Sequence, residues 1–567
     1  MTNTSGRFAF LRQLVADGVM CMFGNPGTSE QNLLDALRDE EFKDFRYYLA
    51  LHEGSAVAMA DGYARALQRP ALVQLHSYAG LANGLGMLYY ARRGYTPLVV
   101  VAGEAGLRYD ALDGQMAADL VTMARPFVKS DYNGPCAWRV LDSGSLLRLL
   151  RRAIKTAATP PTGPVFLALP MDLLDEENTE TIERSLPVRS DVTPDRSVIE
   201  QAAQLLSRAE RPLILMGDGI AASKAQAELT DVAEKLGAVV WGANCSEVNI
   251  AASHPLFCGY GGHMFGQTSR TYTSAADVIL VCGTTVLPEV FPLLKDVFAK
   301  GAHVIHFDLN SYEIAKNFPV SLGALADPKP TLALLSRELD RLMSKGQRAR
   351  AQERLDRQRK SKDLRELEEL AKDATLRDNV PLRAPQFMQA LAERLPKNAL
   401  VFDEALTHSS ELLRYLPQNE PGSYFQTRAG MLGTGFPGAI GLKAAYPDRM
   451  VFGFAGDGGG ISTIQALATA ARHGIGAKFV VCNNRSYRIL KYNLREYWRM
   501  LDQSADQRFP EAFDLDKPNL RFDKIAEGQG VPAMRVERPD EIGRALDRAF
   551  QDLNEPFLID LLLSSEL

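Results

Sequence analysis

Short apolar runs rich in valine, isoleucine and leucine recur along the whole chain, and longer stretches of mixed polarity separate them. Continuous rather than alternating hydrophobicity is typical of parallel strands that are buried on both faces, with helices between them. The pattern therefore predicts an α/β fold of doubly wound parallel sheets. The runs stand at residues 71–76, 97–103, 164–170, 212–217, 277–283, 303–308, 399–403, 450–456, 477–482 and 556–562.

Two changes of composition divide the chain. One is a polar, acidic stretch around residues 175–195, and the other is a stretch at 344–377 that is dense in charge and carries regularly spaced leucines. Such a charged stretch predicts an exposed helix. With about 150 residues per domain as a guide, we expect three α/β domains and a charged helical linker. The domains span 1–185, 190–340 and 375–567, and the linker spans 341–374.

Composition narrows the class of protein further. The 567 residues are 46% hydrophobic and 23% charged, with a net charge of −5, which favours neither a nucleic-acid partner nor a membrane surface. No apolar run approaches the roughly 20 residues that span a bilayer, and the N-terminus does not resemble a signal peptide. The six cysteines are scattered without a Cys-x-x-Cys pair. We therefore expect a cytoplasmic protein with reduced thiols.

The most informative motif lies in the last predicted domain. One strand runs into Gly456-Asp457-Gly458-Gly459-Gly460, with a helix expected to begin near Ser462, and the next strand ends at Asn483-Asn484. Open α/β sheets bind ligands at the carboxyl ends of their strands. Carboxylate and amide oxygens suit Mg²⁺, which completes its octahedron with water and phosphate oxygens. The glycines let backbone N–H groups approach a diphosphate, whereas the lack of a lysine-bearing P-loop argues against a nucleotide hydrolase.

This combination of motifs resembles the signature of enzymes that depend on thiamine diphosphate (ThDP). The resemblance implies that Asp457, Asn484 and an oxygen of Ser486 bind Mg²⁺. It also implies a ThDP site formed by residues from both ends of the chain: Asn25, Pro26, Gly27, Glu53, Asn83, Thr407, His408, Gly430, Leu432, Gly456, Asp457, Gly458, Gly459, Asn484, Ser486 and Tyr487.

A segment in the first domain resembles the activating segment of the same enzymes. It runs from Leu51 through Glu53 to the sequence Ala-Asp-Gly-Tyr-Ala-Arg at 60–65. The resemblance implies that Glu53 hydrogen-bonds the aminopyrimidine ring, while Gly430 offers its carbonyl and Leu432 its side chain to that ring. In the family the glutamate and the diphosphate site meet across a dimer interface. A homodimer at least, and usually a homotetramer, is therefore implied.

Within this superfamily the chain is most similar to benzoylformate decarboxylases, through residues 23–30, 45–51, 75–77 and 421–424. That resemblance implies a carboxy-lyase for a 2-oxo acid, with Thr28 and His76 beside the reacting carbon for carboxylate binding and proton transfer. Thr28 replaces the family's serine. The family's second active-site histidine has no clear counterpart, and His263 or His408 could take its place. The aromatic and cationic residues at 487–499 fit either a larger or anionic substrate or a solvated helix.

Three alternatives stay open at this point. A carboligase similar to acetohydroxyacid synthase often carries FAD in its middle domain. A lyase for 2-hydroxyacyl-CoA or oxalyl-CoA is disfavoured, because many such enzymes close the site with a C-terminal extension and this sequence stops soon after its last strand. A non-catalytic ThDP-binding subunit is disfavoured by the presence of Glu53 together with the metal motif.

Overall fold

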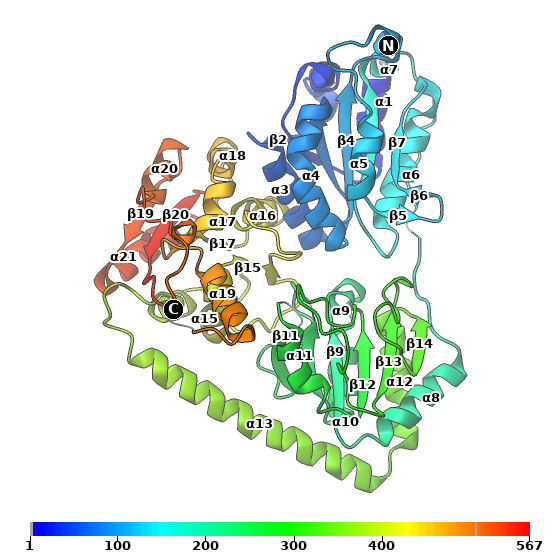
Figure 1. The fold of residues 1–567 in the computed structure, drawn as a ribbon. Helices are drawn as coiled ribbons and strands as arrows, with labels where there is room; N and C mark the ends of the chain where they lie inside the picture. The colour runs from blue at the N-terminus through cyan, green and yellow to red at the C-terminus, as the bar shows by residue number, and fades with distance from the viewer. Residues whose placement is uncertain (1–3, 187, 244, 262–263, 505–506) are drawn as a thin grey trace. The chain divides into compact units, whose positions relative to one another are not determined.

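A computed structural model describes residues 4–186, 188–243, 245–261, 264–504 and 507–567 and shows parallel sheets flanked by helices (Figure 1). The predicted α/β class is confirmed. The chain forms two compact units, of which the first comprises Met1–Val188, Asp378–Ser409 and Thr427–Leu567, and the second comprises Arg189–Arg377 and Ser410–Gln426. The first and third predicted domains thus share one unit, while the predicted domain boundaries themselves stay a prediction.

The first sheet of the first unit has the strand order β2-β1-β3-β4-β8-β7, with every neighbouring pair parallel. One face packs on helices α1 (Gly6–Ala16), α2 (Gln31–Ala36) and α6 (Leu146–Ala158). Helices α3 (Glu53–Leu67) and α4 (Ser77–Arg93) pack on each other and against β3 and β4. The strands are β1 (Cys21–Gly24), β2 (Arg46–Leu49), β3 (Ala71–His76), β4 (Leu98–Glu104), β7 (Ala137–Arg139) and β8 (Val165–Pro170).

The second sheet of this unit contains the strand order β15-β17-β18-β20-β19, again with parallel neighbours. Numbered by their order along the chain, these five strands are arranged in the same way as β1-β3-β4-β8-β7 of the first sheet. The strands are β15 (Leu400–Glu404), β17 (Val451–Gly456), β18 (Lys478–Asn483), β19 (Ala533–Val536) and β20 (Phe557–Leu562). The helices are α14 (Ala384–Ala392), α16 (Gly435–Ala445), α17 (Asp457–Ser462), α18 (Ala466–His473), α19 (Arg488–Met500), α20 (Phe522–Gly528) and α21 (Pro539–Phe550).

Helices α3 and α16 join the two sheets of the first unit through unusually close backbone contact. A Cβ atom on Gly441 would lie 2.0 Å from the carbonyl oxygen of Met59, and one on Gly62 would lie 2.3 Å from the carbonyl oxygen of Gly438. Only glycine fits at such distances. The glycine of the Ala-Asp-Gly-Tyr-Ala-Arg sequence therefore has a packing role in this chain.

The aspartate of the same sequence is part of a buried ion-pair network. Asp61 is fully buried, and its carboxylate lies 3.1 Å from Nη2 of Arg428 and 3.7 Å from Nη1 of Arg65. A buried charge that loses its partner costs about 3–5 kcal/mol. The network therefore fixes α3 against the segment that leads into Gly430.

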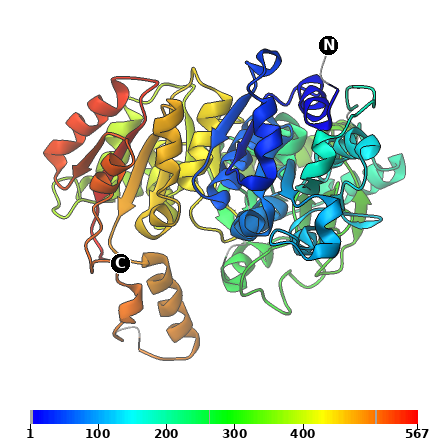
Figure 2. The ribbon, with the colours of Figure 1, turned by 90° about the horizontal axis from the view of Figure 1, so that it is seen from above.

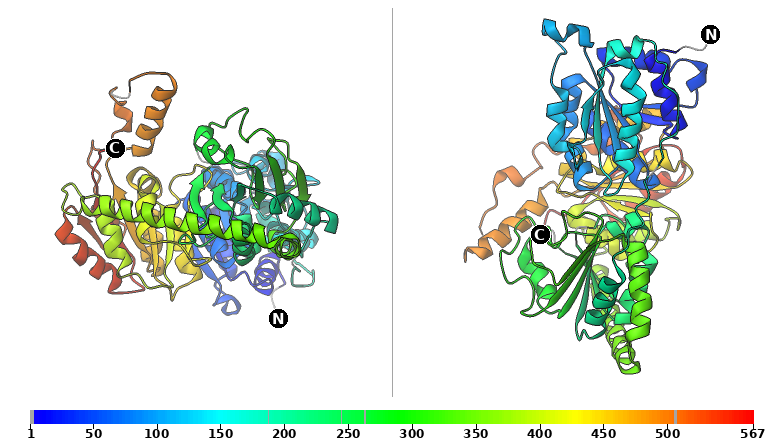
Figure 3. Two further views of the ribbon diagram at one scale, coloured as in Figure 1. Left: turned by 90° about the horizontal axis from the view of Figure 1, so that it is seen from below. Right: turned by 90° about the vertical axis from the view of Figure 1, so that its right-hand side faces the viewer.

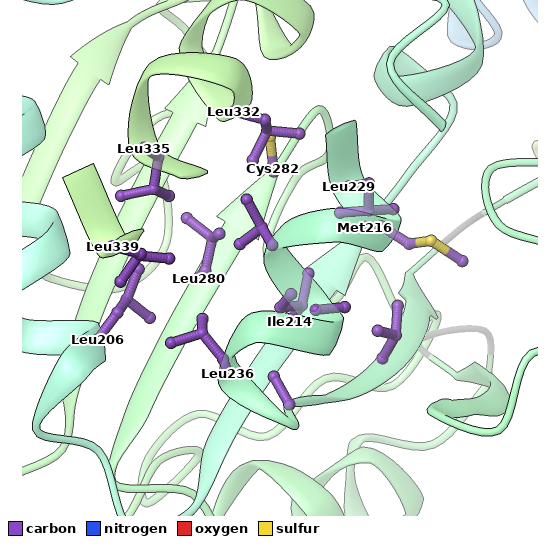
Figure 4. Close-up of a cluster of buried hydrophobic side chains, with 14 of the residues drawn as sticks. Leu206, Ile214, Met216, Leu229, Leu236, Leu280, Cys282, Leu332, Leu335 and Leu339 are labelled. Atoms are coloured by element: carbon purple, nitrogen blue, oxygen red, sulfur yellow. The ribbon is translucent and has the colours of Figure 1, made fainter. Parts of the chain in front are cut away.

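The central domain lies in the second unit, and its sheet has the strand order β11-β10-β9-β12-β13-β14. Alternate residues of its strands face a core that is covered by α8 (Arg196–Ser207), α10 (Gln226–Leu236) and α12 (Pro328–Leu342). Figure 4 shows Cys282 among these leucines, where the thiol acts as a small apolar group. The strands are β9 (Pro212–Met216), β10 (Val239–Ala243), β11 (Phe257–Gly261), β12 (Val278–Cys282), β13 (His303–Asp308) and β14 (Leu322–Leu325).

The charged stretch forms the long helix α13 (Lys345–Ala374), seen lengthwise in Figure 3. Ser344 and Gln347 form a capping box at its start, and Ala351 packs closely on Gly237. Near its end, Asp373 accepts hydrogen bonds from Arg414 at 2.6 Å and Tyr415 at 3.0 Å. The helix is thus anchored at both ends. None of the helices described is long and apolar enough to span a membrane.

Candidate active site

The carboxyl ends of β17 and β18 bring Asp457 and Asn484 to the same edge of their sheet. Asp457 is 3% exposed, its carboxylate accepts N–H groups of Gly458 at 2.8 Å and Ser486 at 3.2 Å, and burial raises its pKa to about 6. Oδ1 of Asn484 is buried and has no hydrogen-bond partner among the described residues. A buried carboxylate and an unsatisfied amide oxygen are donors suited to a hard cation.

Ser486, the third predicted ligand, lies beside Asp457. Its hydroxyl donates to the Phe513 carbonyl at 3.1 Å, and its own carbonyl accepts the Arg488 N–H at 2.7 Å while keeping a second lone pair. The described residues contain no cluster of three His, Cys, Asp or Glu side chains that could hold a metal. A cation at Asp457 and Asn484 therefore needs further oxygen ligands, such as phosphate or water.

The glycines after β17 allow close packing as well as backbone access. A Cβ atom on Gly458 would lie 2.4 Å from the Tyr487 ring, and one on Gly459 would lie 2.4 Å from the Glu404 carboxylate, whereas Gly456 has open space around it. Helix α17 begins at Asp457 itself, so the predicted start near Ser462 was wrong. The helix starts earlier because the tightly packed glycines adopt helical backbone despite their low helix propensity.

Glu404, at the end of β15, connects the two loops of this site. Its fully buried carboxylate accepts the N–H groups of Gly433 at 2.5 Å and Gly435 at 2.6 Å, and it also packs against Gly459. Burial raises its pKa to about 7, against the lowering effect of the backbone hydrogen bonds. Sequence reasoning did not assign Glu404 a role, although the residue stands three positions before the predicted site residue Thr407.

Hydrogen bonds fix both ends of the loop that carries Gly430 and Leu432, while the middle of the loop is exposed. Thr427 Oγ1 donates to the Met431 carbonyl at 2.8 Å, and Thr463 Oγ1 donates to the Gly433 carbonyl at 2.9 Å. Gly430 has a φ of +68°, which favours glycine, and Leu432 is 36% exposed. The loop can therefore offer an apolar side chain to a ligand.

His408 lies in the same cluster. It is 3% exposed, its Nε2 lies 3.4 Å from Nη1 of Arg488, and its charge lowers the pKa of Asp457. Its predicted place near a diphosphate stays a prediction. His263, the other candidate for the second histidine, lies outside the described residues.

In the first sheet, the predicted residues Asn25 and Asn83 both contact Glu53. Glu53 begins helix α3 and is 6% exposed. Its Oε1 accepts a hydrogen bond from Asn25 Nδ2 and its Oε2 accepts one from Asn83 Nδ2, both at 3.0 Å. Asn25 follows β1 and Asn83 lies on α4, so two separate elements aim amide donors at this carboxylate. The arrangement holds Glu53 in one orientation.

The imidazole of His76 is fixed by residues that sequence reasoning missed. Its Nδ1 lies 2.9 Å from Glu30 Oε2 and 3.0 Å from Ser29 Oγ. Glu30 is 3% exposed and also accepts bonds from Ser29 Oγ at 2.7 Å and from the N–H groups of Gly27 and Gly103 at 2.9 Å. Because the carboxylate accepts at Nδ1, the ring presents Nε2 for proton transfer.

The remaining predicted residues of this loop are less constrained. A Cβ atom on Gly27 would lie 2.3 Å from the His76 ring, so only glycine fits there. Pro26 is partly buried and Thr28 is exposed. Thr28 is therefore free to meet a ligand, while the neighbouring Ser29 serves His76.

Four of the twelve non-glycine residues with positive φ in the described part of the chain adjoin predicted site residues. Ser77 (φ +46°), Leu406 (φ +52°), Ala429 (φ +54°) and Arg485 (φ +58°) all adopt the left-handed region, although none is glycine. They directly adjoin His76, Thr407, Gly430 and Asn484 respectively. Such strain persists where the surrounding structure enforces it, and it tends to cluster at functional sites.

Glu53 and the cation-site residues lie beside different sheets of the first unit. No hydrogen bond or ion pair among the described residues joins Glu53 to Asp457 or Asn484. The carboxylate at the start of α3 and the cation site after β17 are therefore separate halves in this structure.

Three family models match the chain along its length. They are the thiamine pyrophosphate enzyme N-terminal TPP binding domain at residues 4–123, the central domain at 199–335 and the C-terminal TPP binding domain at 407–561. Their order agrees with the three predicted domains.

Curated relatives and solved structures agree with these matches. A benzoylformate decarboxylase of Pseudomonas aeruginosa is 30% identical over 99% of this chain and 98% of its own length. A probable acetolactate synthase large subunit of Methanococcus aeolicus is 27% identical over 99% and 92%. The structure of a thiamine diphosphate-dependent 4-hydroxybenzoylformate decarboxylase from Rhodococcus jostii RHA1 matches with a TM-score of 0.83 and 26% identity over 99% of both chains. The chain belongs to the thiamine pyrophosphate enzyme family.

Proposed function

We propose that this protein uses ThDP and Mg²⁺ to break the C–C bond beside the ketone carbon of a 2-oxo acid, releasing CO₂ and an aldehyde. The observation that carries the proposal is the Glu53 carboxylate, buried and held at 3.0 Å by both Asn25 and Asn83. Two amide donors from separate elements fix the direction of this carboxylate, as a hydrogen bond to a cofactor ring would require. Similarity to the decarboxylases of Pseudomonas aeruginosa and Rhodococcus jostii supports the choice of reaction.

The donors at the end of β17 and β18 fit the cation. Asp457, the unsatisfied Oδ1 of Asn484 and an oxygen of Ser486 would hold Mg²⁺. The backbone around Gly456, Gly458 and Gly459 would bind the diphosphate, with Thr407, His408 and Tyr487 beside it. When bound, ThDP supplies a thiazolium carbon that adds to the substrate ketone and accepts the electrons of the broken bond.

The remaining residues would direct this chemistry. Glu53 would hydrogen-bond the aminopyrimidine ring and so place a proton acceptor beside the reacting carbon. His76, oriented by Glu30 at 2.9 Å, would move a proton at Nε2. Thr28 would bind the substrate carboxylate through its hydroxyl, and Leu432 would pack against the ring. An apolar surround favours loss of CO₂, because charge disperses in the transition state.

A homodimer would bring the two halves of the site together, with Glu53 of one subunit facing Asp457 of the other. The family resemblance supports this arrangement, because in that family the glutamate and the diphosphate site meet across a dimer interface. We place the protein in the cytoplasm, and a homotetramer would be a pair of such dimers.

A carboligase is the second candidate function. The 27% identity to a probable acetolactate synthase large subunit over 99% of the chain favours it. The two reactions share every step up to CO₂ loss and differ in whether a proton or a second carbonyl compound is taken up. Product analysis therefore separates them.

The test is a panel of 2-oxo acids assayed with and without ThDP and Mg²⁺, with CO₂, aldehydes and ligated ketones measured. Glu53→Gln should keep ThDP binding and lose most turnover, whereas Asp457→Ala should lose ThDP binding itself. Ligated products in place of aldehydes would select the carboligase. Normal turnover in Glu53→Gln, or no ThDP-dependent turnover of any substrate, would refute the proposal.

A further inference from the structure

Helix α19, directly after the cation site, carries two arginines whose charge is not neutralised. Lys491 pairs with Asp514 at 2.7 Å, and Arg499 pairs with Glu496. Arg488 and Arg495 have no carboxylate within ion-pair distance in the part of the chain that the structure describes. The helix therefore contains both satisfied and unsatisfied cations, and the unsatisfied Arg488 is the one nearest Asp457 in the chain.

The described contacts of the Arg488 guanidinium include no carboxylate. Nη1 lies 3.4 Å from His408 Nε2, Nη2 donates to the Tyr492 hydroxyl at 3.3 Å, and the guanidinium lies over the Tyr492 ring at 5.7 Å. Nε is buried and has no hydrogen-bond partner among the described residues. A guanidinium has five N–H donors in a planar fork that matches an oxyanion. A partly buried cation with an unused donor is poised to bind an anion.

The Arg488 side chain lies next to the predicted site residues and contacts Tyr492 along α19. Ser486 lies two residues before Arg488, and His408, which contacts the guanidinium, directly follows Thr407, a predicted residue of the diphosphate site. Tyr487 covers Gly458, whereas the Arg488 side chain reaches along α19 to Tyr492. The described contacts of the Arg488 guanidinium are thus with His408 and Tyr492, and none is with the glycines after β17.

The scaffold around Arg488 is preformed, although α19 projects from the sheet (Figure 2). The N–H of Tyr487 donates to the Phe513 carbonyl at 2.8 Å, and the N–H of Leu515 donates to the Arg485 carbonyl at 2.8 Å. Trp498 stacks on Phe509 with ring centroids 5.3 Å apart. The helix is thus held by its own return segment, and this limits the ordering cost when a ligand binds.

We propose that Arg488 binds a negatively charged group of the substrate that is remote from the reacting carbonyl: a carboxylate, sulfonate or phosphate. The Tyr492 ring packs against the guanidinium, and His408 contacts its Nη1. This inference rests on the proposed function, and it names the substrate class as 2-oxo acids with a second anionic group. The diphosphate of the cofactor has the same chemistry, so the test separates the two sources.

The test compares 2-oxo acids of equal length that end in a carboxylate or in the neutral amide. The wild-type enzyme should prefer the charged member. Arg488→Met should lower kcat/KM for that member by about 10- to 100-fold, the loss expected for hydrogen bonds to a charged group, and leave the neutral member unchanged. Arg488→Lys should restore part of the loss, while Arg499→Met, on the same helix but paired with Glu496, should change neither.

A binding measurement keeps this test independent of turnover. Isothermal titration of the ThDP-loaded protein with glutarate and with its monoamide should show tighter binding of the dianion, and Arg488→Met should remove that preference. If no 2-oxo acid is turned over but the preference is present, the proposed function fails and the anion site stands. Equal binding of both compounds to the wild type, or weaker ThDP binding in Arg488→Met with equal losses for all substrates, would overturn the inference.

Discussion

Replacing Glu30 by glutamine should lower the activity that depends on His76, although His76 itself is unchanged. The carboxylate accepts four donors: His76 Nδ1–H, Ser29 Oγ–H and the N–H groups of Gly27 and Gly103. An amide keeps only one accepting oxygen, so its NH₂ group must face at least one of these N–H donors. One unsatisfied buried donor costs about 1–3 kcal/mol of folding free energy.

The effect on catalysis is expected to be larger than the effect on stability. If Glu30 holds His76 so that Nε2 faces the substrate, the Glu30→Gln variant can lose the full general acid–base contribution of His76. That contribution is about 10²–10⁴-fold in kcat. Ser29→Ala keeps the Glu30 contact to His76, so its loss should be below about tenfold. Steady-state kinetics and denaturant unfolding on the same samples separate the two effects.

A double-mutant cycle decides whether Glu30 acts through His76. Glu30→Gln combined with His76→Ala should be no slower than His76→Ala alone, because a positioning residue has nothing left to position. Multiplicative losses in the double variant would refute the reasoning. A Glu30→Gln variant with normal kcat would refute it as well.

Two further predictions concern folding. Gly441→Ala should lower the free energy of unfolding by at least about 1–3 kcal/mol, because the added Cβ would sit 2.0 Å from the Met59 carbonyl; Gly474→Ala, with no atom within 4 Å of its added Cβ, should cost less, although its φ of +60° disfavours alanine. Burial raises the pKa of Glu404 from 4.5 to about 7, so the folded chain keeps a proton that the unfolded chain releases, and stability falls as pH rises through this window. The cofactor-free Glu404→Gln variant should therefore gain stability relative to wild type between about pH 5 and pH 7.5, and a pH-independent difference in urea unfolding would contradict the assignment.

The parts of the site that could be predicted from sequence are those fixed by local order. Asp457 and Asn484 follow neighbouring buried strands, and parallel strands place their carboxyl ends at one edge. Glu53 was found by resemblance, and its two amide partners were among the predicted residues. Strand cores were predicted to within one or two residues, because continuous apolar runs leave little freedom in the choice of element.

The parts that could not be predicted depend on pairs far apart in the sequence. Arg428 meets Asp61 across 367 positions, and no local pattern marks either residue as half of a buried ion pair. Glu30 and His76 likewise become partners only once β1 and β3 pair. Several strands of three to five residues were also missed, because so short a run does not stand out in the sequence: β1, β2, β7, β10, β11, β14 and β19.

Mixing two inactive subunits tests the shared site most directly. Differently tagged Glu53→Gln and Asp457→Ala chains are co-expressed, and the mixed dimer is isolated through both tags. If each site draws its carboxylate from one chain and its cation ligands from the other, one of two sites regains both native halves, and about half of the wild-type turnover should return. If the mixed dimer is as inactive as either parent, the site lies within a single chain and the account is wrong.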